Sequence, residues 1–201
     1  MRSTPPLPDW ITHKQVPGYV NAHRLVPDEN RLFGTESLFG DWCGEVLLLA
    51  EIFGSASDLR DGLRSGDTRP YRHDPTRKIN KSLEILASPV RGRGLLYGNA
   101  LGNLLLGDEG RKKDKKEAIQ YGIEVTRFVI DSMPSCRWIV CLGSVAWDVA
   151  TQATGLDGNW AYHRESAEPL DRLIATNSPS ARGVSMEELQ RQWSAIYPDA
   201  D

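Results

Sequence analysis

Apolar and polar residues follow two alternating patterns along this chain. Continuous apolar runs, typical of strands buried on both faces of a parallel sheet, occur at residues 46–50, 94–101, 137–142 and 170–176. Helical patterns follow the runs at residues 78–87, 117–132, 143–153 and from 185 to before 198. This alternation predicts an α/β fold with three layers, α/β/α, around a central four-stranded parallel sheet.

Two segments lack these patterns. Residues 1–40 contain five prolines and little periodicity, which predicts an extended arm with one short helix packed on the domain. Residues 41–201 then form a single α/β domain. Residues 55–77 are rich in Gly, Asp and Arg and are predicted to form a long loop, of the kind that is usually functional or disordered.

The composition is that of an ordinary globular domain, with 40% hydrophobic and 25% charged residues among 201. No stretch approaches the ~20 apolar residues that cross a bilayer, and the N-terminus lacks a signal-peptide pattern. Cys43, Cys136 and Cys141 are scattered without a C-x-x-C motif, which excludes a disulfide framework and a four-cysteine metal site. We expect a reduced, cytoplasmic, monomeric protein without metal, cofactor or membrane contact.

Polar residues follow the ends of the apolar runs. Glu51 comes directly after the first run, Asn99 lies near the end of the second, Gly143 follows the third, and residues 177–178 follow the fourth. Taken alone, Glu51 is better explained as the cap of a solvated loop. The alternative interpretation of Asn99 is a satisfied polar turn at a strand end. Because ligands of open α/β sheets bind outside the carboxyl ends of the strands, the convergence of these residues favours a binding or catalytic site.

Four short motifs accompany these ends, in order between residues 40 and 183. Residues 50–58 read AEIFGSASD, 95–101 read LLYGNAL, 138–150 read WIVCLGSVAWDVA and 178–183 read SPSARG. Together they resemble the motifs of the uracil-DNA glycosylase superfamily. In one branch the first strand precedes GE-x-PG-x-x-ED, which this chain matches at Glu51, Gly54 and Asp58 but not at the first glycine, the proline or the second acid.

The resemblance implies a glycosylase-like domain and a DNA repair enzyme. Such an enzyme flips uracil out of DNA and hydrolyses its N-glycosidic bond, releasing free uracil and leaving an abasic site. The closing motif of the family is H-P-S followed by a small residue, and this chain has Ser178-Pro179-Ser180 instead. The iron–sulfur cysteines of some branches are absent as well, so the chain resembles an atypical member.

The residue types fit base excision. A carboxylate near the developing oxocarbenium ion or its attacking water is needed, and Glu51 is the candidate, with Asp58 second or as a loop or DNA-positioning group. The amide of Asn99 can donate to and accept from the pairing edge of uracil. Ser178 or Asn177 could supply the hydrogen bond of the missing histidine to the leaving uracil anion.

Other residues are candidates for contacts with DNA. Residues 60–93 hold nine Lys or Arg and four Asp or Glu, a local charge of +5 that includes Arg72 and Arg77. Ser180 and Arg182 belong to the closing motif, which the resemblance brings near the DNA strand.

An aromatic side chain must stack on the flipped base, and two residues are candidates, Phe53 and Tyr71. The lysines within residues 112–116 are interleaved with acids and are interpreted as a solvated face.

Two other functions remain open at this point. A catalytically degenerate protein of the same fold could bind DNA or uracil without cutting, which the lost motif residues allow. An enzyme acting on a free nucleotide or nucleoside could use the same sheet edge, but Arg182 and the basic segment argue against it.

Overall fold

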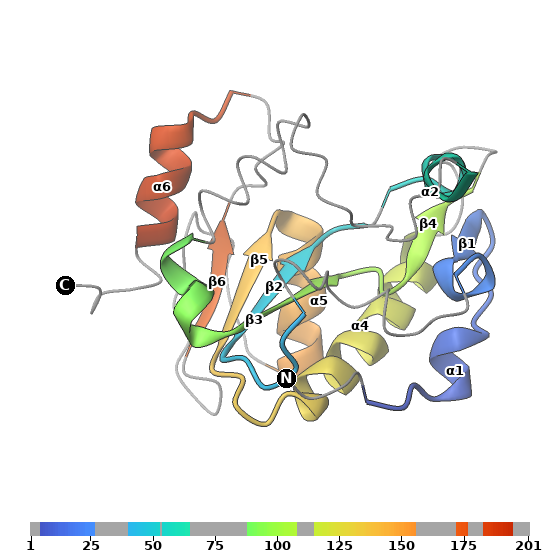
Figure 1. The fold of residues 1–201 in the computed structure, drawn as a ribbon, viewed down its shortest axis with the longest axis horizontal. Helices are drawn as coiled ribbons and strands as arrows, with labels where there is room; N and C mark the ends of the chain where they lie inside the picture. Colours follow the sequence, from blue (N-terminus) through green and yellow to red (C-terminus); the bar gives the residue numbers. More distant parts are fainter. Residues whose placement is uncertain are drawn as a thin grey trace.

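The computed structural model describes residues 5–26, 40–52, 54–64, 88–107, 115–155, 172–176 and 183–194. A parallel sheet lies at the centre of the molecule (Figure 1). Its strands are β2 (Val46–Ala50), β3 (Leu95–Asn99), β5 (Trp138–Leu142) and β6 (Arg172–Thr176). They are hydrogen-bonded in the order β3-β2-β5-β6, and each neighbouring pair runs parallel.

The expected mixed α/β fold with a parallel sheet is confirmed. Each of these strands lies within one of the apolar runs, and β2 has the predicted bounds. All five residues of β5 are buried, as are the first four of β2. Burial on both faces is the reason that these runs are continuously apolar rather than alternating.

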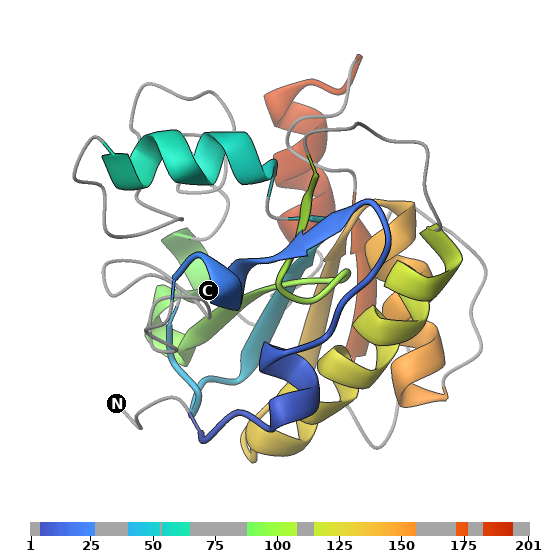
Figure 2. The same ribbon diagram turned by 90° about the vertical axis from the view of Figure 1, so that its right-hand side faces the viewer.

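Two hydrophobic clusters cover the two faces of the sheet. Successive side chains of a strand point to opposite faces, so Leu47 and Leu49 join the larger cluster and Val46 and Leu48 the smaller one. The larger cluster includes α4 (Lys115–Ser132) and α5 (Ser144–Thr154), which lie side by side in Figure 2. The smaller cluster includes Leu189 of α6 (Met186–Ser194), so helices contribute to both faces.

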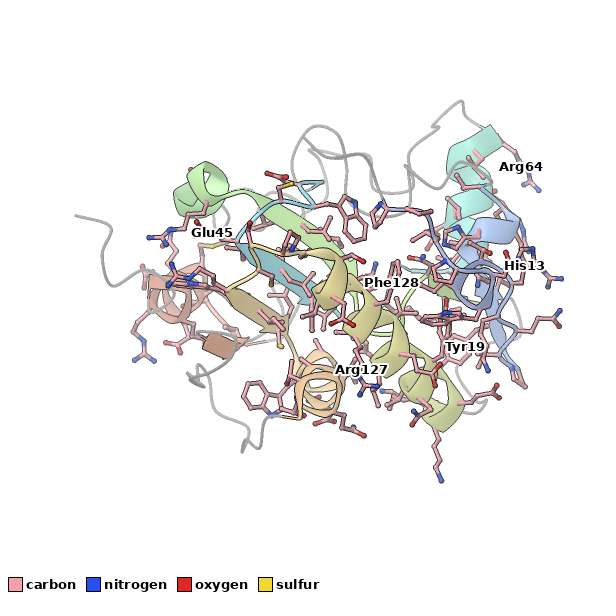
Figure 3. All side chains as sticks on the ribbon, turned by 90° about the horizontal axis from the view of Figure 1, so that it is seen from below. His13, Tyr19, Glu45, Arg64, Arg127 and Phe128 are labelled. Atoms are coloured by element: carbon pink, nitrogen blue, oxygen red, sulfur yellow. The ribbon has the colours of Figure 1, made fainter. Side chains whose placement is uncertain are left out.

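Polar contacts join and cap the helices. Arg127 of α4 reaches the C-terminal end of α5 (Figure 3), where its Nε donates to the carbonyl oxygen of Ala153 at 3.3 Å. The capping pattern before α6 is confirmed, because the backbone N–H of Glu188 donates to Ser185 Oγ at 3.1 Å. In the described part of the chain, no helix combines the length and apolar character needed to cross a membrane.

The N-terminal segment forms more regular structure than the sequence predicts. Its elements are α1 (Asp9–Thr12), β1 (Tyr19–Asn21) and a short 3-10 helix, η1 (Ala22–Arg24). Strand β1 pairs antiparallel with β4 (Leu104–Leu106) in a second, two-stranded sheet (Figure 2). Ile11, Val16, Ala22 and Val26 of the N-terminal segment belong to the larger cluster, so this segment contributes to the core.

The prediction of a loop at residues 55–77 is wrong for its first part. Helix α2 spans Ala56–Arg64. Ser55 starts this helix, since its Oγ accepts the backbone N–H of Asp58 at 3.1 Å. Ala56 and Leu59 are buried and Leu63 is half-buried, which gives the helix an apolar stripe at i, i+3 and i+7. The helix predicted at residues 78–87 lies outside the described residues, which resume with the 3-10 helix Ser88–Arg93 (η3).

Candidate functional site at the carboxyl edge of the sheet

The direction in which the chain adds strands reverses between β2 and β5. After β2, the chain adds β3 on one side, then returns to the other side for β5 and β6. In open α/β sheets, such a reversal leaves a crevice outside the carboxyl ends of the two central strands, and ligands bind there. Glu51 and Gly143 follow the carboxyl ends of β2 and β5, so both lie at this point.

Glu51 and Asn99 are brought to adjacent positions, as the sequence predicts. Ala50 and Asn99 are opposite each other in the parallel register of β2 and β3. Beyond them, the N–H of Ala100 donates to the carbonyl oxygen of Ala50 at 2.6 Å, and the N–H of Leu101 donates to that of Glu51 at 3.1 Å. These bonds hold the backbone of Glu51 against the turn that follows Asn99.

The two side chains meet different environments. Asn99 is buried, with 6% of its surface exposed, whereas Glu51 is exposed. By strand alternation Asn99 lies on the same face as Tyr97, which packs against the smaller cluster. Burial raises the pKa of Tyr97 to about 12, so this phenol stays neutral at physiological pH. The site therefore combines a desolvated amide with a solvated carboxylate.

Glu51 has a partner that the sequence did not indicate. Lys115, the first residue of α4, places its Nζ 3.3 Å from Glu51 Oε1, and each side chain is about half exposed, at 53% and 49%. Our interpretation of this lysine as only a solvated face is therefore incomplete. An exposed ion pair contributes about 0–1 kcal/mol, so a ligand can separate the two groups at little cost.

Gly143 provides an open backbone position at the carboxyl end of β5. Its φ of 101° is in the region that favours glycine, and a Cβ added there would meet no atom within 4 Å among the described residues. Gly143 precedes α5 without a side-chain hydrogen bond to cap the helix. The first N–H groups of a helix have no intrahelical acceptor, so the start of α5 supplies donors at the carboxyl end of β5.

Gly54 and Asp58, the other matched positions of the first motif, lie beside each other. Gly54 has a φ of 126°, and its carbonyl oxygen accepts the N–H of Leu106 at 2.9 Å, which ties this loop to β4. A Cβ added to Gly54 would lie 4.0 Å from Asp58 Oδ2. Asp58 is exposed in the first turn of α2, where an acid is favourable for the helix dipole.

A buried polar pair supports the turn after Asn99. Asn103 Nδ2 lies 2.7 Å from His23 Nε2, and the N–H of Ala22 donates to the carbonyl oxygen of Asn103 at 2.8 Å. Because the amide nitrogen can only donate, His23 Nε2 accepts and Nδ1 carries the proton. Burial lowers the pKa of His23 to about 4, and the charge of His13 adds to this effect. The pair joins residues 80 positions apart, and the sequence carried no signal for it.

The remaining predicted site residues lie outside the described residues. They are Phe53, Tyr71, Arg72, Arg77, Asn177, Ser178, Ser180 and Arg182. The structure describes the residues on either side of the closing motif, up to Thr176 and from Gly183 onward. Thr176, at the end of β6, is paired with Leu142, and Val184 packs against the smaller cluster together with Tyr97.

Comparisons with known proteins leave the family of this chain open. No protein-family model matches the sequence, and no curated protein matches it significantly. Within the described ranges, no group of three or more His, Cys, Asp or Glu side chains is arranged to hold a metal ion.

Proposed function

We propose that this protein is a uracil-DNA glycosylase with the three-layer α/β/α fold of that superfamily, acting as a monomer in the cytoplasm without metal or cofactor. The observation that carries the proposal is the register of β2 and β3, in which Ala50 faces Asn99 and Glu51 follows directly. The backbones of the two residues are neighbours at the carboxyl edge of the sheet, next to the switch point between β2 and β5, and a carboxylate and an amide are the two groups that uracil excision requires.

Asn99 recognises the base in this proposal. Its side-chain oxygen accepts the N–H of the uracil pairing edge, and its NH₂ group donates to the adjacent uracil carbonyl. Because Asn99 is buried, these hydrogen bonds form away from water. A base that lacks the matching groups leaves both hydrogen bonds unmade in a desolvated place, and the resulting loss of affinity gives discrimination.

Glu51 acts on the sugar. As the glycosidic bond breaks, positive charge develops on the deoxyribose, and a carboxylate beside it stabilises that charge and orients the attacking water. The half-exposed position of Glu51 gives water access to this side of the site. The contact with Lys115 joins two half-exposed side chains and is weak enough for the sugar to displace it.

The leaving base carries negative charge and needs hydrogen-bond donors. Ser178 or Asn177 and the first N–H groups of α5 are the donors that we assign to this role. Phe53 or Tyr71 stacks on the flipped uracil, and Arg72, Arg77, Ser180 and Arg182 contact the DNA backbone. Gly54 and Asp58 shape the loop after β2.

A direct test uses an end-labelled oligonucleotide that contains a single uracil. Incubation with the protein, followed by alkali and a denaturing gel, cuts the strand at the uracil if an abasic site has formed. A matched oligonucleotide with thymine at the same position controls for nuclease contamination. Glu51→Gln, which keeps the size of the side chain but removes its charge, should excise uracil much more slowly than the natural protein.

A second candidate is a DNA- or uracil-binding protein without catalysis. The ion pair between Glu51 and Lys115 favours it, because it reduces the negative charge available to the sugar. In this case the protein would retain uracil-containing oligonucleotide in a binding assay, and alkali would leave the strand intact.

A further inference from the structure

A primary amine lies beside the carboxylate that we assign to the sugar. Lys115 Nζ is 3.3 Å from Glu51 Oε1, so an atom in contact with that carboxylate is within reach of the amine as well. About half of the lysine side chain is exposed, which leaves it free to move toward a ligand. The described lysines also include Lys14, which pairs with Glu117 at 3.1 Å, and Lys116, which is exposed on the next position of α4.

The position of Lys115 differs from that of an ordinary helix cation. A lysine in the first turn of a helix is unfavourable for the helix dipole, and Lys115 begins the 18-residue helix α4. Its pairing with Glu51 offsets this cost and points the amine at the carboxyl edge of the sheet. An amine in that place can react with a carbonyl carbon, a reaction that the guanidinium of arginine does not undergo.

We propose that Lys115 is the nucleophile of a second activity, cleavage of the DNA strand at an abasic site. This inference rests on the proposed function, because it takes the carboxylate of Glu51 to lie beside the sugar. The substrate is the product of base excision, whose C1′ hemiacetal is in equilibrium with an open-chain aldehyde.

The reaction begins with formation of an imine. The ammonium of Lys115 gives a proton to Glu51, and the free amine adds to the C1′ aldehyde to form a carbinolamine. Glu51 returns that proton to the carbinolamine hydroxyl, which leaves as water while a protonated C1′=N bond forms. The ionised carboxylate is thereby restored.

Elimination then breaks the strand. Glu51 removes a proton from C2′, the C2′–H electron pair forms a C2′=C3′ double bond, and the C3′–O bond breaks, so that the 3′-phosphate leaves with its bonding electrons. Water hydrolyses the imine and regenerates Lys115. Glu51 gives the C2′ proton to the departing phosphate, so both side chains return to their starting protonation states, and the sequence requires no oxidant or reductant.

The test uses an oligonucleotide with a preformed abasic site, so that its outcome does not depend on uracil excision. Sodium borohydride, which reduces an imine to a stable amine, is added to the natural protein, to Lys115→Arg and to Lys116→Arg. Arginine keeps the charge at each position but forms no trapped adduct. We expect a covalent protein–DNA adduct with the natural protein and with Lys116→Arg, its loss with Lys115→Arg, and attachment to Lys115 by peptide mapping.

Several outcomes would overturn the inference: absence of an adduct with the natural protein, an undiminished adduct with Lys115→Arg, or attachment to a different lysine. Peptide mapping of the natural protein decides the matter even if a variant folds poorly. A parallel reaction with uracil-containing oligonucleotide tests the proposed function by itself. A protein that excises uracil without an adduct refutes the lyase activity alone, and a protein that is trapped on the abasic site without excising uracil refutes the glycosylase alone.

Discussion

Acidification from pH 6.5 to about pH 4 should destabilise the protein through His23. This side chain is 9% exposed and is held neutral, with Asn103 donating to its Nε2 at 2.7 Å. Its Nδ1 is buried and has no hydrogen-bond partner among the described residues. Protonation would place a charge in this desolvated position and turn Nε2 into a donor facing another donor.

The sign and size of the effect follow from the two pKa values. Burial lowers the pKa of His23 from 6.5 to about 4, so between these values the unfolded chain binds a proton that the folded protein does not. The free energy of unfolding therefore falls as the pH falls through this window, and it is insensitive to this group above and below it. A difference of about 2.5 between the pKa values corresponds to about 3 kcal/mol, a large part of the 5–15 kcal/mol that stabilises a typical domain.

Urea unfolding followed by circular dichroism, at a series of pH values across the window, measures this loss. His23→Gln keeps a polar side chain at the site but does not titrate, so the difference in pH dependence between this variant and the natural protein isolates His23. The matched control is His13→Gln, which removes a histidine whose side chain is 78% exposed and which lies at the surface in Figure 3. We expect a flatter pH profile for His23→Gln. For His13→Gln we expect only a small change, because burial is the main cause of the low pKa of His23 and the charge of His13 is the lesser one.

Equal pH profiles for His23→Gln and the natural protein would refute this reasoning. They would mean that the His23 side chain is protonated in the folded protein, or that water reaches it there and removes the effect of burial. A flattened profile for His13→Gln alone would mean that His13, and not His23, is the group responsible for the pH dependence.

Four further predictions concern the candidate site, its support and the DNA contacts. Glu51→Gln should still bind an uncleavable uracil analogue while slowing single-turnover excision, since in the proposed mechanism the carboxylate acts chiefly in the transition state. Asn99→Asp should shift preference toward cytosine, whose amino group can donate to a carboxylate, and an unchanged base preference would mean that Asn99 does not contact the base. Gly122 of α4 lies against the backbone carbonyl of Ala100, in the turn after Asn99, and an added Cβ would overlap that carbonyl. Gly122→Ala should therefore lower the urea midpoint strongly. Near-natural stability would show that α4 can move away from the turn. Replacing Arg72 and Arg77 by alanine should weaken DNA binding and flatten its salt dependence, by about one counterion for each phosphate that the protein no longer neutralises; an unchanged slope would mean that these side chains face away from DNA.

Local patterns in the sequence were sufficient for the sheet and for part of the site. Strands buried on both faces must be apolar at every position, so β2 and β5 are readable as continuous runs. Because the carboxyl ends of parallel strands share one edge, the positions of Glu51 just after its run and of Asn99 near the end of its run indicated that the two residues would lie at the same edge. The Ser185 cap of α6 was equally readable, since its partner is only three residues away.

Only the tertiary structure decided the contacts between distant segments. Helix α2 did leave a local signal, the apolar stripe at i, i+3 and i+7, which the Gly, Asp and Arg content of the segment outweighed. The pairing of β1 with β4, by contrast, joins two strands of three residues each that are far apart in the chain. Lys115 and Glu51 are 64 positions apart, and His23 and Asn103 are 80 positions apart. Such pairs leave no periodic trace in the sequence, because their partners are brought together by the packing of α4 and of the N-terminal segment on the sheet and not by the local geometry of a helix or strand.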